Sequence, residues 1–120
     1  MTRSVPTIVS EYLAAADRRD VDAIVACFAN DATVLDEDRE WHRHAGIRKW
    51  RTEVATAYDY TVEVLRTVAL GEIDGVERHD VYTHLEGNFP GGTVDLTNRF
   101  WLRDTHIVRL EIVPTEGTEL

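Results

Sequence analysis

Three polar side chains, those of Tyr12, Asp36 and Asn98, stand in apolar stretches of the sequence and could together carry out proton transfer. A carboxylate between apolar walls can have a raised pKa and act as a general base. A buried phenol or amide needs a hydrogen-bond partner, which a substrate oxygen can provide. Each residue also has an ordinary interpretation: Asn98 bonded to backbone in the core, the Tyr12 hydroxyl reaching water, and Asp36 in a solvated turn. The sequence leaves both interpretations open.

The elements that carry these residues follow from the hydrophobic pattern. Residues 93–103 alternate as a strand does, and one face of that strand carries Val94, Leu96, Asn98, Phe100 and Leu102. Asn98 therefore lies in the middle of an apolar inner row. A helix is predicted from Pro6 to Arg18, and its apolar stripe includes Tyr12 together with Ile8, Val9, Leu13 and Ala16. Asp36 directly follows a short predicted strand, Thr33–Leu35.

The rest of the chain is interpreted in the same way. Asp20 is predicted to cap a second helix, whose stripe runs to Phe28 and which ends at Asn30-Asp31. Residues 39–46 are expected to form a loop and residues 47–58 a third helix. Further strands are expected over residues 60–70, 76–87 and 107–113, with tight turns at 74–75, 88–92 and 104–105.

This order of elements predicts an α+β fold in one domain over residues 1–120. Three helices come first, with one short strand among them, and a four-stranded meander follows. The helices can cover one apolar face of the meander. A curved sheet closed in this way encloses a concave interior that either fills with side chains or holds a small ligand.

Composition and charge exclude several classes of protein. Hydrophobic residues make up 43% of the 120 residues, which argues against a disordered chain. No apolar run is long enough to span a membrane, and residues 1–9 lack the pattern of a signal peptide. Acidic residues outnumber basic ones 22 to 13, giving a formal net charge of −9, so neither a nucleic acid nor an anionic membrane surface is an expected partner. We therefore expect a soluble cytoplasmic protein.

Histidine and cysteine give weaker signals. His42 and His44 form an H-x-H pair in the expected loop, but no third ligand stands at a fixed spacing, so no metal site is predicted. His79, His84 and His106 alternate with charged residues and are expected at the surface or rim. Cys27 is the single cysteine, which excludes a disulfide framework, and we interpret it as a buried inert thiol.

The helical half of the chain resembles a known superfamily in several segments. These are Tyr12-Leu13-Ala14-Ala15-Ala16, Asp20-Val21-Asp22-Ala23-Ile24, residues 28–34 with Asp36, and Gly46-Ile47-Arg48-Lys49-Trp50. They are similar to the SnoaL-like and ketosteroid-isomerase-like branch of the nuclear transport factor 2-like superfamily. Asn88-Phe89-Pro90-Gly91-Gly92 and the two closing strands are similar to SnoaL-like proteins as well. The resemblance therefore extends over nearly the whole chain.

The resemblance implies a cone-shaped α+β barrel with a deep apolar pocket, and roles for the three polar residues. Tyr12 falls on the oxyanion tyrosine of ketosteroid isomerases, Asp36 on the general base, and Asn98 on a protonated aspartic acid. On this interpretation Asp36 removes a proton α to a carbonyl, and Tyr12 and Asn98 donate hydrogen bonds to the enolate oxygen. This chemistry needs no cofactor, and Phe28, Trp50, Asp80 and Phe100 are expected to line the substrate pocket.

The resemblance also implies partners. The ligand is expected to be a small hydrophobic molecule. Members of the superfamily commonly form homodimers through the outer sheet face, which here would carry Thr97, Arg99, Trp101 and Arg103.

Two alternatives remain at this point. The same fold could serve as a non-catalytic small-molecule-binding or assembly module. Alternatively, Glu77-Arg78-His79-Asp80-Val81 resembles the Arg-x-Asp strand of limonene-epoxide-hydrolase-like members, in which two acids and an arginine open an epoxide. In that interpretation Arg78 and Asp80 carry the reaction, but the second acid, expected on the last strand, meets Ile112 with only Glu111 nearby.

Overall fold

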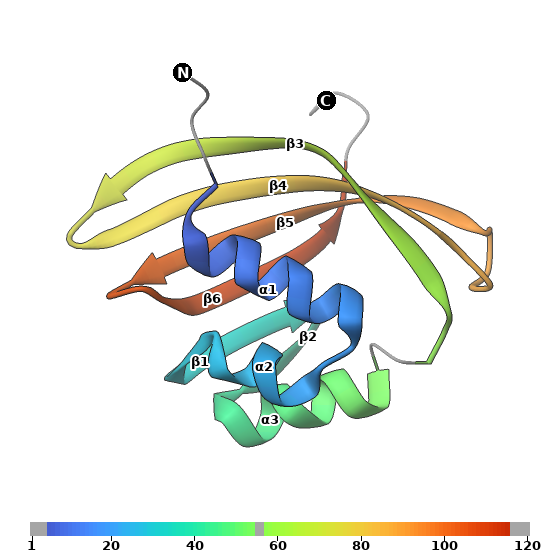
Figure 1. Ribbon diagram of the computed structural model, residues 1–120, viewed down its shortest axis with the longest axis horizontal. Coiled ribbons are helices and arrows are strands. Elements are labelled where there is room, and N and C mark those ends of the chain that lie inside the picture. The colour runs from blue at the N-terminus through green and yellow to red at the C-terminus, as the bar shows by residue number, and fades with distance from the viewer. Residues whose placement is uncertain (1–4, 55–56, 116–120) are drawn as a thin grey trace.

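A single six-stranded sheet organises the molecule, in the order β2-β1-β6-β5-β4-β3 (Figure 1). The computed structural model describes residues 5–54 and 57–115. The strands are β1 (Phe28–Asp36), β2 (Arg39–His42), β3 (Tyr60–Ile73), β4 (Val76–Gly87), β5 (Thr93–Arg103) and β6 (His106–Pro114). β1 and β6 pair in parallel, and the other neighbours pair antiparallel.

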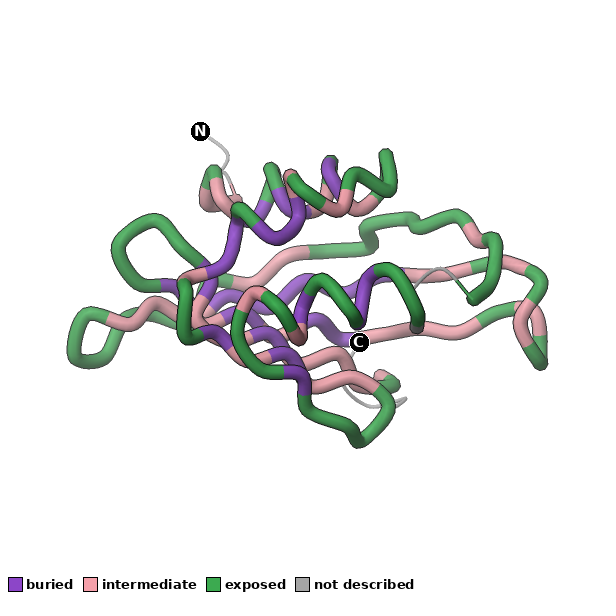
Figure 2. Tube along the Cα trace, turned by 90° about the horizontal axis from the view of Figure 1, so that it is seen from below, coloured by how far each residue is buried: buried purple, intermediate pink, exposed green. Residues whose placement is uncertain are grey.

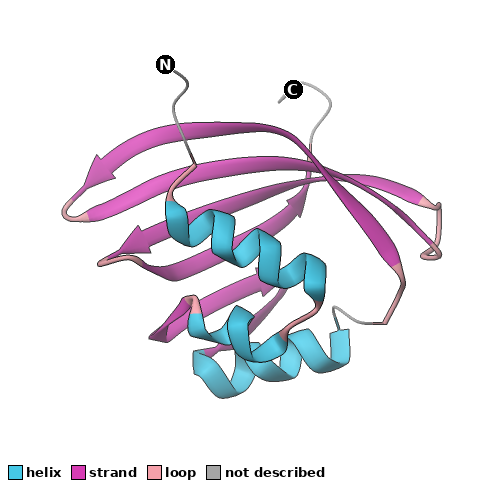
Figure 3. Cartoon of the chain, viewed as in Figure 1, coloured by secondary structure: helices cyan, strands magenta, loops and turns pink. Residues whose placement is uncertain are grey.

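The helices lie against one side of this curved sheet (Figure 3). They are α1 (Thr7–Arg18), α2 (Val21–Ala26) and α3 (Arg43–Lys49), and α3 continues as a π-helix, η1 (Trp50–Val54). The predicted α+β class, with a curved sheet and three helices, is confirmed. The Asp20 carboxylate accepts a hydrogen bond from the backbone N–H of Ala23 at 3.2 Å, which confirms the predicted cap of α2.

The meander follows the sequence pattern closely. β4 and β5 begin and end at the predicted residues, and β3 and β6 are each a little longer than predicted. Asp74 and Gly75 both have positive φ, 54° and 80°, as a tight hairpin turn requires. Asp104 and Thr105 make the β5–β6 turn in the same way, with φ of 52° and 64°.

The segment between α1 and β3 departs from the prediction in two places. α2 ends at Ala26 rather than at Asn30, and β1 begins at Phe28. Residues 39–46, expected to be a loop, form β2 and the start of α3. Both differences have one cause: β1 pairs with β2 and with the distant β6, and these ladders satisfy backbone groups that the local pattern leaves unassigned.

The third helix also ends earlier than predicted. It was expected to run to Tyr58, but Ala57 and Tyr58 are not helical, and residues 55–56 lie outside the described residues.

β3 is an edge strand with β4 as its neighbour and carries two β-bulges. The register shifts between Val64 and Arg66 and again between Ala69 and Gly71, which leaves Leu65 and Leu70 as extra residues. Both leucines are exposed. β3 has 14 residues and β4 has 12, and the two bulges account for the difference.

The hydrophobic core lies between the helices and what we call the inner face of the sheet, which carries Val34, Val81, Phe100 and Leu110. In Figure 2 the buried residues gather where helices and strands meet, and the hairpin ends are exposed or half-buried. Tyr12 of α1 packs edge-to-face on Phe28 and Phe100, with ring centroids 5.8 and 5.6 Å apart. The opposite side of the sheet is the outer face.

Candidate functional site

Strand pairing brings Asp36 and Asn98 to the same level of the inner face. Asp36 of β1 is opposite Ile112 of β6, and Ile112 is opposite Asn98 of β5. Neighbouring strands are about 4.8 Å apart, so the Cα atoms of Asp36 and Asn98 are separated by roughly 10 Å. Asn98 is 7% exposed, and Phe100, two residues further on the same face, touches Tyr12. The three predicted polar residues therefore face one interior.

Asp36 ends β1 and is held by a tryptophan. Its Oδ2 accepts a hydrogen bond of 2.9 Å from Nε1 of Trp50, and no other side-chain hydrogen bond to Asp36 is recorded among residues 5–54 and 57–115. Burial raises the pKa of the Asp36 carboxyl, while the Trp50 hydrogen bond and the charge of Arg51 oppose that rise. The backbone of Glu37 also hydrogen-bonds the carboxyl and opposes the rise, so the carboxylate is partly desolvated and held in place.

Tyr12 presents a protonated hydroxyl to the same interior. The residue is 3% exposed, and burial raises the pKa of the phenol to about 12. Arg51 opposes this rise, whereas Tyr60 and Asp36 add to it, so these groups lie within electrostatic reach of the hydroxyl. Within the described part of the chain, no hydrogen bond involves this hydroxyl. Tyr12 is therefore a neutral donor at physiological pH.

Asn98 is used differently from the expectation. Its Nδ2 donates one hydrogen bond to the backbone carbonyl of Val81 and one to Oγ1 of Thr83, both at 3.1 Å. A carbonyl can only accept, so the amide nitrogen must face Val81. Both N–H groups are consumed within the sheet, and the amide has no donor left for a substrate oxygen. The satisfied-core interpretation of Asn98 describes this structure.

Three of the four residues expected to line a pocket are core residues on the inner side. Trp50 and Phe28 are each 1% exposed, and Phe100 is 0% exposed. Asp80 lies elsewhere: it is adjacent to the inner residue Val81 on β4 and faces the outer side, where it pairs with Arg78 at 2.9 Å. The expectation that Asp80 lines the interior is therefore wrong.

The same geometry removes the basis of the epoxide interpretation. Arg78 and Asp80 point away from the interior, and no second acid of the described chain pairs with Arg78. Instead the Arg78 guanidinium lies over the Trp101 ring, 4.0 Å from its centroid. Glu111, the acid nearest the expected position, also faces outward and pairs with Arg99 and Arg109.

On the outer face, a network of paired charges surrounds the ring of Trp101. Arg109 approaches Trp101 from β6, 5.8 Å from the ring centroid, and bonds Glu111 at 2.8 Å. Thr97 is 0% exposed, and its hydroxyl lies 2.9 Å from that of Thr115. Trp101 is half-buried.

The histidines and the cysteine do not gather into a site. His44 donates to the carbonyl of Phe28 at 2.7 Å, and His42 is exposed beside Thr33. Across residues 5–54 and 57–115, no group of His, Cys, Asp and Glu is arranged to hold a metal ion. Cys27 is buried, and burial raises the pKa of its thiol.

His79 corrects the expectation of a surface residue. It is 2% exposed, and both ring nitrogens are buried without a hydrogen-bond partner among the described residues. Because it is opposite Phe100, it lies on the inner face.

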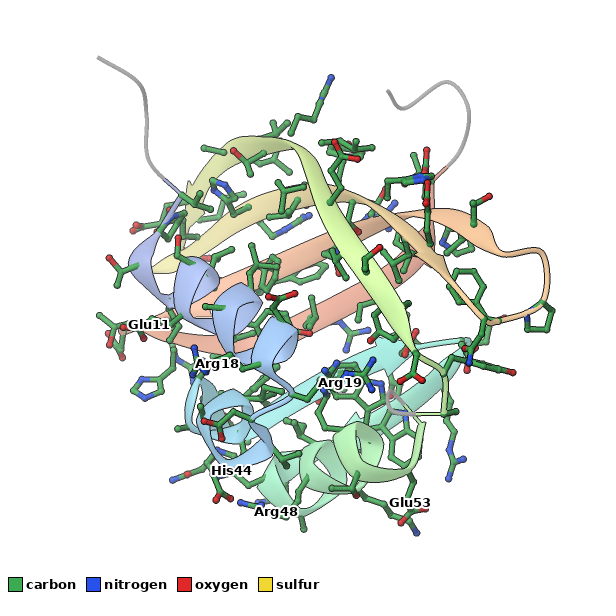
Figure 4. All side chains as sticks on the ribbon, turned by 45° about the vertical axis from the view of Figure 1, so that its right-hand side comes forward. Glu11, Arg18, Arg19, His44, Arg48 and Glu53 are labelled. Atoms are coloured by element: carbon green, nitrogen blue, oxygen red, sulfur yellow. The ribbon has the colours of Figure 1, made fainter. Side chains whose placement is uncertain are left out.

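The residues labelled in Figure 4 lie on the helical side of the molecule, on α1, directly after it, on α3 and on η1. Arg19 follows α1, bonds the carbonyl of Tyr58 at 3.4 Å, and lies over the Tyr60 ring at 5.5 Å. It therefore links the end of α1 to the start of β3. Arg48 lies on the exposed side of α3 and pairs with Asp22 at 2.8 Å.

Arg51 is the member of the site that sequence reasoning missed. It follows Trp50 in η1, is 5% exposed, and its guanidinium lies 5.0 Å from the centroid of the Trp50 ring. In the predicted third helix the apolar stripe is Ile47, Trp50, Val54 and Ala57, and position 51 is not part of it. The wider π-helical turn brings both Trp50 and Arg51 inside, and such turns are frequent at functional sites. The one signal in the sequence is an arginine next to the apolar stripe position of Trp50.

Two surface clefts lie away from these residues. One of about 820 Å³ is bounded by the start of α1 and the β3–β4 and β5–β6 turns, including Ile8, Glu77 and Leu102. The other, about 330 Å³, lies between α1 and α2 beside Cys27. Neither is lined by Tyr12, Asp36 or Asn98.

Comparisons with known proteins place the chain among small α+β domains. A sequence model of the SnoaL-like domain matches residues 9–110. A candidate polyketide cyclase from Sinorhizobium meliloti is 34% identical and superposes with a TM-score of 0.83, over 91% of this chain and 95% of that chain. Among curated proteins, no sequence matches the chain.

More distant solved structures share the fold alone. The orange carotenoid protein of Anabaena (Nostoc), solved binding canthaxanthin, has a TM-score of 0.84 at 18% identity, over 100% of this chain and 39% of that chain. A protein with a ketosteroid isomerase-like fold from Catenulispora acidiphila, solved with trimethylamine, has a TM-score of 0.76 at 16% identity, over 93% of this chain and 88% of that chain.

No helix within residues 5–54 and 57–115 combines the length and apolarity needed to cross a bilayer.

Fold and sequence agree on one family assignment. The family match covers most of the chain, and the 34% identical structure is covered almost entirely. The chain belongs to the SnoaL-like branch of the nuclear transport factor 2-like superfamily.

Proposed function

We propose that the protein is an enzyme that removes a proton from the carbon next to a carbonyl of a small apolar molecule, as a SnoaL-like cyclase or a ketosteroid isomerase does. The observation that carries the proposal is the Asp36 carboxylate. It is partly desolvated, its Oδ2 is fixed by Trp50 at 2.9 Å, and it faces the same interior as the Tyr12 hydroxyl. A general base needs this combination of a raised pKa and a fixed orientation.

The reaction would use the two oxygens of Asp36 differently. Oδ2 keeps the hydrogen bond from Trp50, so Oδ1 takes the proton from the α-carbon. The electron pair of the broken C–H bond moves toward the carbonyl oxygen, and an enolate forms. Tyr12 donates its O–H to that oxygen, because its raised pKa keeps it protonated. An isomerase then returns the proton to another carbon, whereas a cyclase lets the enolate carbon attack a second carbonyl.

Asn98 contributes to this mechanism by position rather than by donation. Its two N–H groups hold β4 and β5 together through Val81 and Thr83. The role that the resemblance implied for it, a hydrogen bond to the enolate, therefore requires those bonds to break. We assign the enolate contact to Tyr12.

The apolar body of the substrate has a surface available beside Asn98. Leu96 precedes it by two residues on the inner face, and Val64 and Val62 continue that face on β3 through the pairing with β4. Val62 and Val64 are 41% and 46% exposed, unlike the inner residues under α1. A hydrophobic ligand that covers them gains the free energy of apolar burial.

The test is exchange of α-protons in deuterated water, followed by NMR or mass spectrometry. The ligand panel contains ketosteroids, aromatic polyketide mimics and small cyclic ketones. We expect wild-type protein to catalyse exchange and Asp36→Asn to abolish it. Asp38→Asn is the matched control, because Asp38 belongs to the same acidic turn but is exposed, and asparagine tolerates its φ of 62°. Tyr12→Phe should slow exchange by about 10²- to 10³-fold.

Two outcomes oppose the proposal. Exchange that persists in Asp36→Asn excludes Asp36 as the base. An absence of exchange across the panel, with ligands that nonetheless raise the melting temperature, would favour the non-catalytic binding module.

We also propose that two copies associate through the outer face, as the family resemblance implies. Trp101 between Arg78 and Arg109 supports this, since tryptophan and arginine are enriched at interfaces. Sedimentation velocity should show a dimer that Trp101→Glu dissociates. Wild-type protein that sediments as a monomer would contradict this proposal.

A further inference from the structure

Arg51 is buried without the partner that a buried cation requires. The residue is 5% exposed, and its Nε is buried with no hydrogen-bond partner in the described chain. No ion pair joins its guanidinium to a carboxylate of residues 5–54 or 57–115. Among the described residues, the other arginines without a carboxylate partner are Arg39, Arg43 and Arg66, and all three are exposed to water. Arg51 is therefore a buried arginine whose charge has no carboxylate partner among the described residues.

The charge lies near the proposed site. It lowers the pKa of both Tyr12 and Asp36, so the guanidinium is within electrostatic reach of these two groups. Arg51 also lies over the indole of Trp50, whose Nε1 bonds Asp36. This stacking fixes the plane of the guanidinium and offsets part of its desolvation. The N–H groups at its edge remain for a ligand.

A role as the counter-ion of Asp36 does not explain the arrangement. Asp36 takes its hydrogen bond from Trp50, and no nitrogen of Arg51 lies within 4.0 Å of its oxygens. A protein that needed only to neutralise Asp36 would form a direct pair, as Arg78 and Asp80 do at 2.9 Å on the outer face. Arg51 lies near Asp36 without a direct ion pair, so Asp36 does not occupy its N–H groups.

We propose that the site takes a small aromatic or alicyclic acid, whose carboxylate binds the guanidinium of Arg51 while its apolar body covers Val62 and Val64, the exposed inner-face residues of β3. The inference rests on the proposed function, because it names the class of substrate that Asp36 would act on. A planar guanidinium offers two parallel N–H groups to a carboxylate, which makes arginine the preferred partner for such ligands. One arginine matches one carboxylate, and the nearby Asp36 disfavours a dianion.

The experiment compares an acid with its uncharged ester. Naphthoate and methyl naphthoate are titrated into wild-type protein, Arg51→Met, Arg51→Lys and Arg48→Met by isothermal calorimetry. Methionine keeps much of the length and apolar bulk of the side chain without the charge. Arg48→Met is the matched control, since Arg48 lies one turn earlier and pairs with Asp22 on the exposed side.

We expect wild-type protein to bind the acid at least about tenfold more tightly than the ester, the factor that one hydrogen bond to a charged group supplies. Arg51→Met should lose this preference while still binding the ester. Arg51→Lys should keep part of it, because lysine restores the charge without the planar pair of donors, and Arg48→Met should keep all of it.

Equal affinity of wild-type protein for acid and ester overturns the inference. So does an equal preference in wild-type protein and Arg51→Met, and so does an absence of binding of either ligand. If Arg51→Met does not fold, the wild-type comparison and Arg51→Lys decide the question. Asp36→Asn separates this inference from the proposed function: it should lose proton exchange and still prefer the acid.

Discussion

The hydrogen bond between Trp50 and Asp36 makes the cost of Trp50→Phe depend on pH. Phenylalanine keeps an aromatic ring in the core but removes the N–H that bonds Oδ2 of Asp36 at 2.9 Å. A hydrogen bond to an ionised group contributes about 1.5–3 kcal/mol, against about 0.5–1.5 kcal/mol for a neutral one. The loss of packing around the smaller ring adds a cost that does not vary with pH. The substitution should therefore cost about 1–1.5 kcal/mol more when Asp36 is ionised than when it is protonated.

The sign follows from the pKa of Asp36. Burial raises this pKa in the folded protein, and the Trp50 hydrogen bond opposes the rise. Removing the bond raises the folded pKa further and leaves the unfolded value unchanged. The variant therefore loses additional stability as pH rises through the folded pKa, which lies above 3.8.

Urea denaturation of wild type and variant at several values between about pH 4 and pH 8 measures this difference. Trp41→Phe is the control, because Trp41 is also buried but its Nε1 has no hydrogen-bond partner among the described residues. Its cost should be the same at every pH. A cost of Trp50→Phe that is equally flat would refute the hydrogen bond to a carboxylate and, with it, the orientation of the proposed base.

Three further substitutions test single features. Asp36→Asn should raise the free energy of unfolding near neutral pH, because burial raises the pKa of Asp36, and the gain should vanish in acid, as denaturation at two pH values will show. His79→Leu should leave stability unchanged or raise it by about 1 kcal/mol near neutral pH, since both ring nitrogens lack partners. Burial lowers the pKa of His79, so wild-type protein should lose stability as pH falls below 6.5, and the leucine variant should lose less. Asp20→Ala removes the cap of α2 and should cost about 0.5–2 kcal/mol in thermal or urea unfolding, and no loss would show that the bond to Ala23 contributes nothing.

Local pattern was sufficient to predict the meander and the orientation of its side chains. β4 and β5 have the predicted bounds, because alternation and turn residues are properties of neighbouring positions. The same alternation placed Asn98 on the inner face. Alternation also requires Asp80 to face away from its neighbour Val81, and therefore outward. The wrong expectation that Asp80 lines the pocket came from the family resemblance and not from this pattern.

The features that depend on contacts between distant parts of the chain could not be predicted from local pattern. β1 starts at Phe28 because it joins β6, more than seventy residues later along the chain, and no local signal encodes that ladder. The donors of Asn98 are consumed because the Val81 carbonyl and the Thr83 hydroxyl lie within reach, which alternation cannot show. Arg51 enters the site because a π-helical turn rotates it inward, and helical periodicity assumes that no such turn occurs.

The two bulges of β3 bear on how this family can change length. Each extra residue, Leu65 and Leu70, reverses which side chains of β3 face inward, and the second reversal restores the phase of the first. Deleting either leucine removes one bulge and leaves its neighbours on the faces that they now occupy, for example Arg66 outward and Thr67 inward. Because β3 has a ladder on one side, such a change disturbs one partner and not two. Insertions and deletions of single residues among relatives should therefore collect in this strand and reshape the rim beside Val62 and Val64 without moving Asp36.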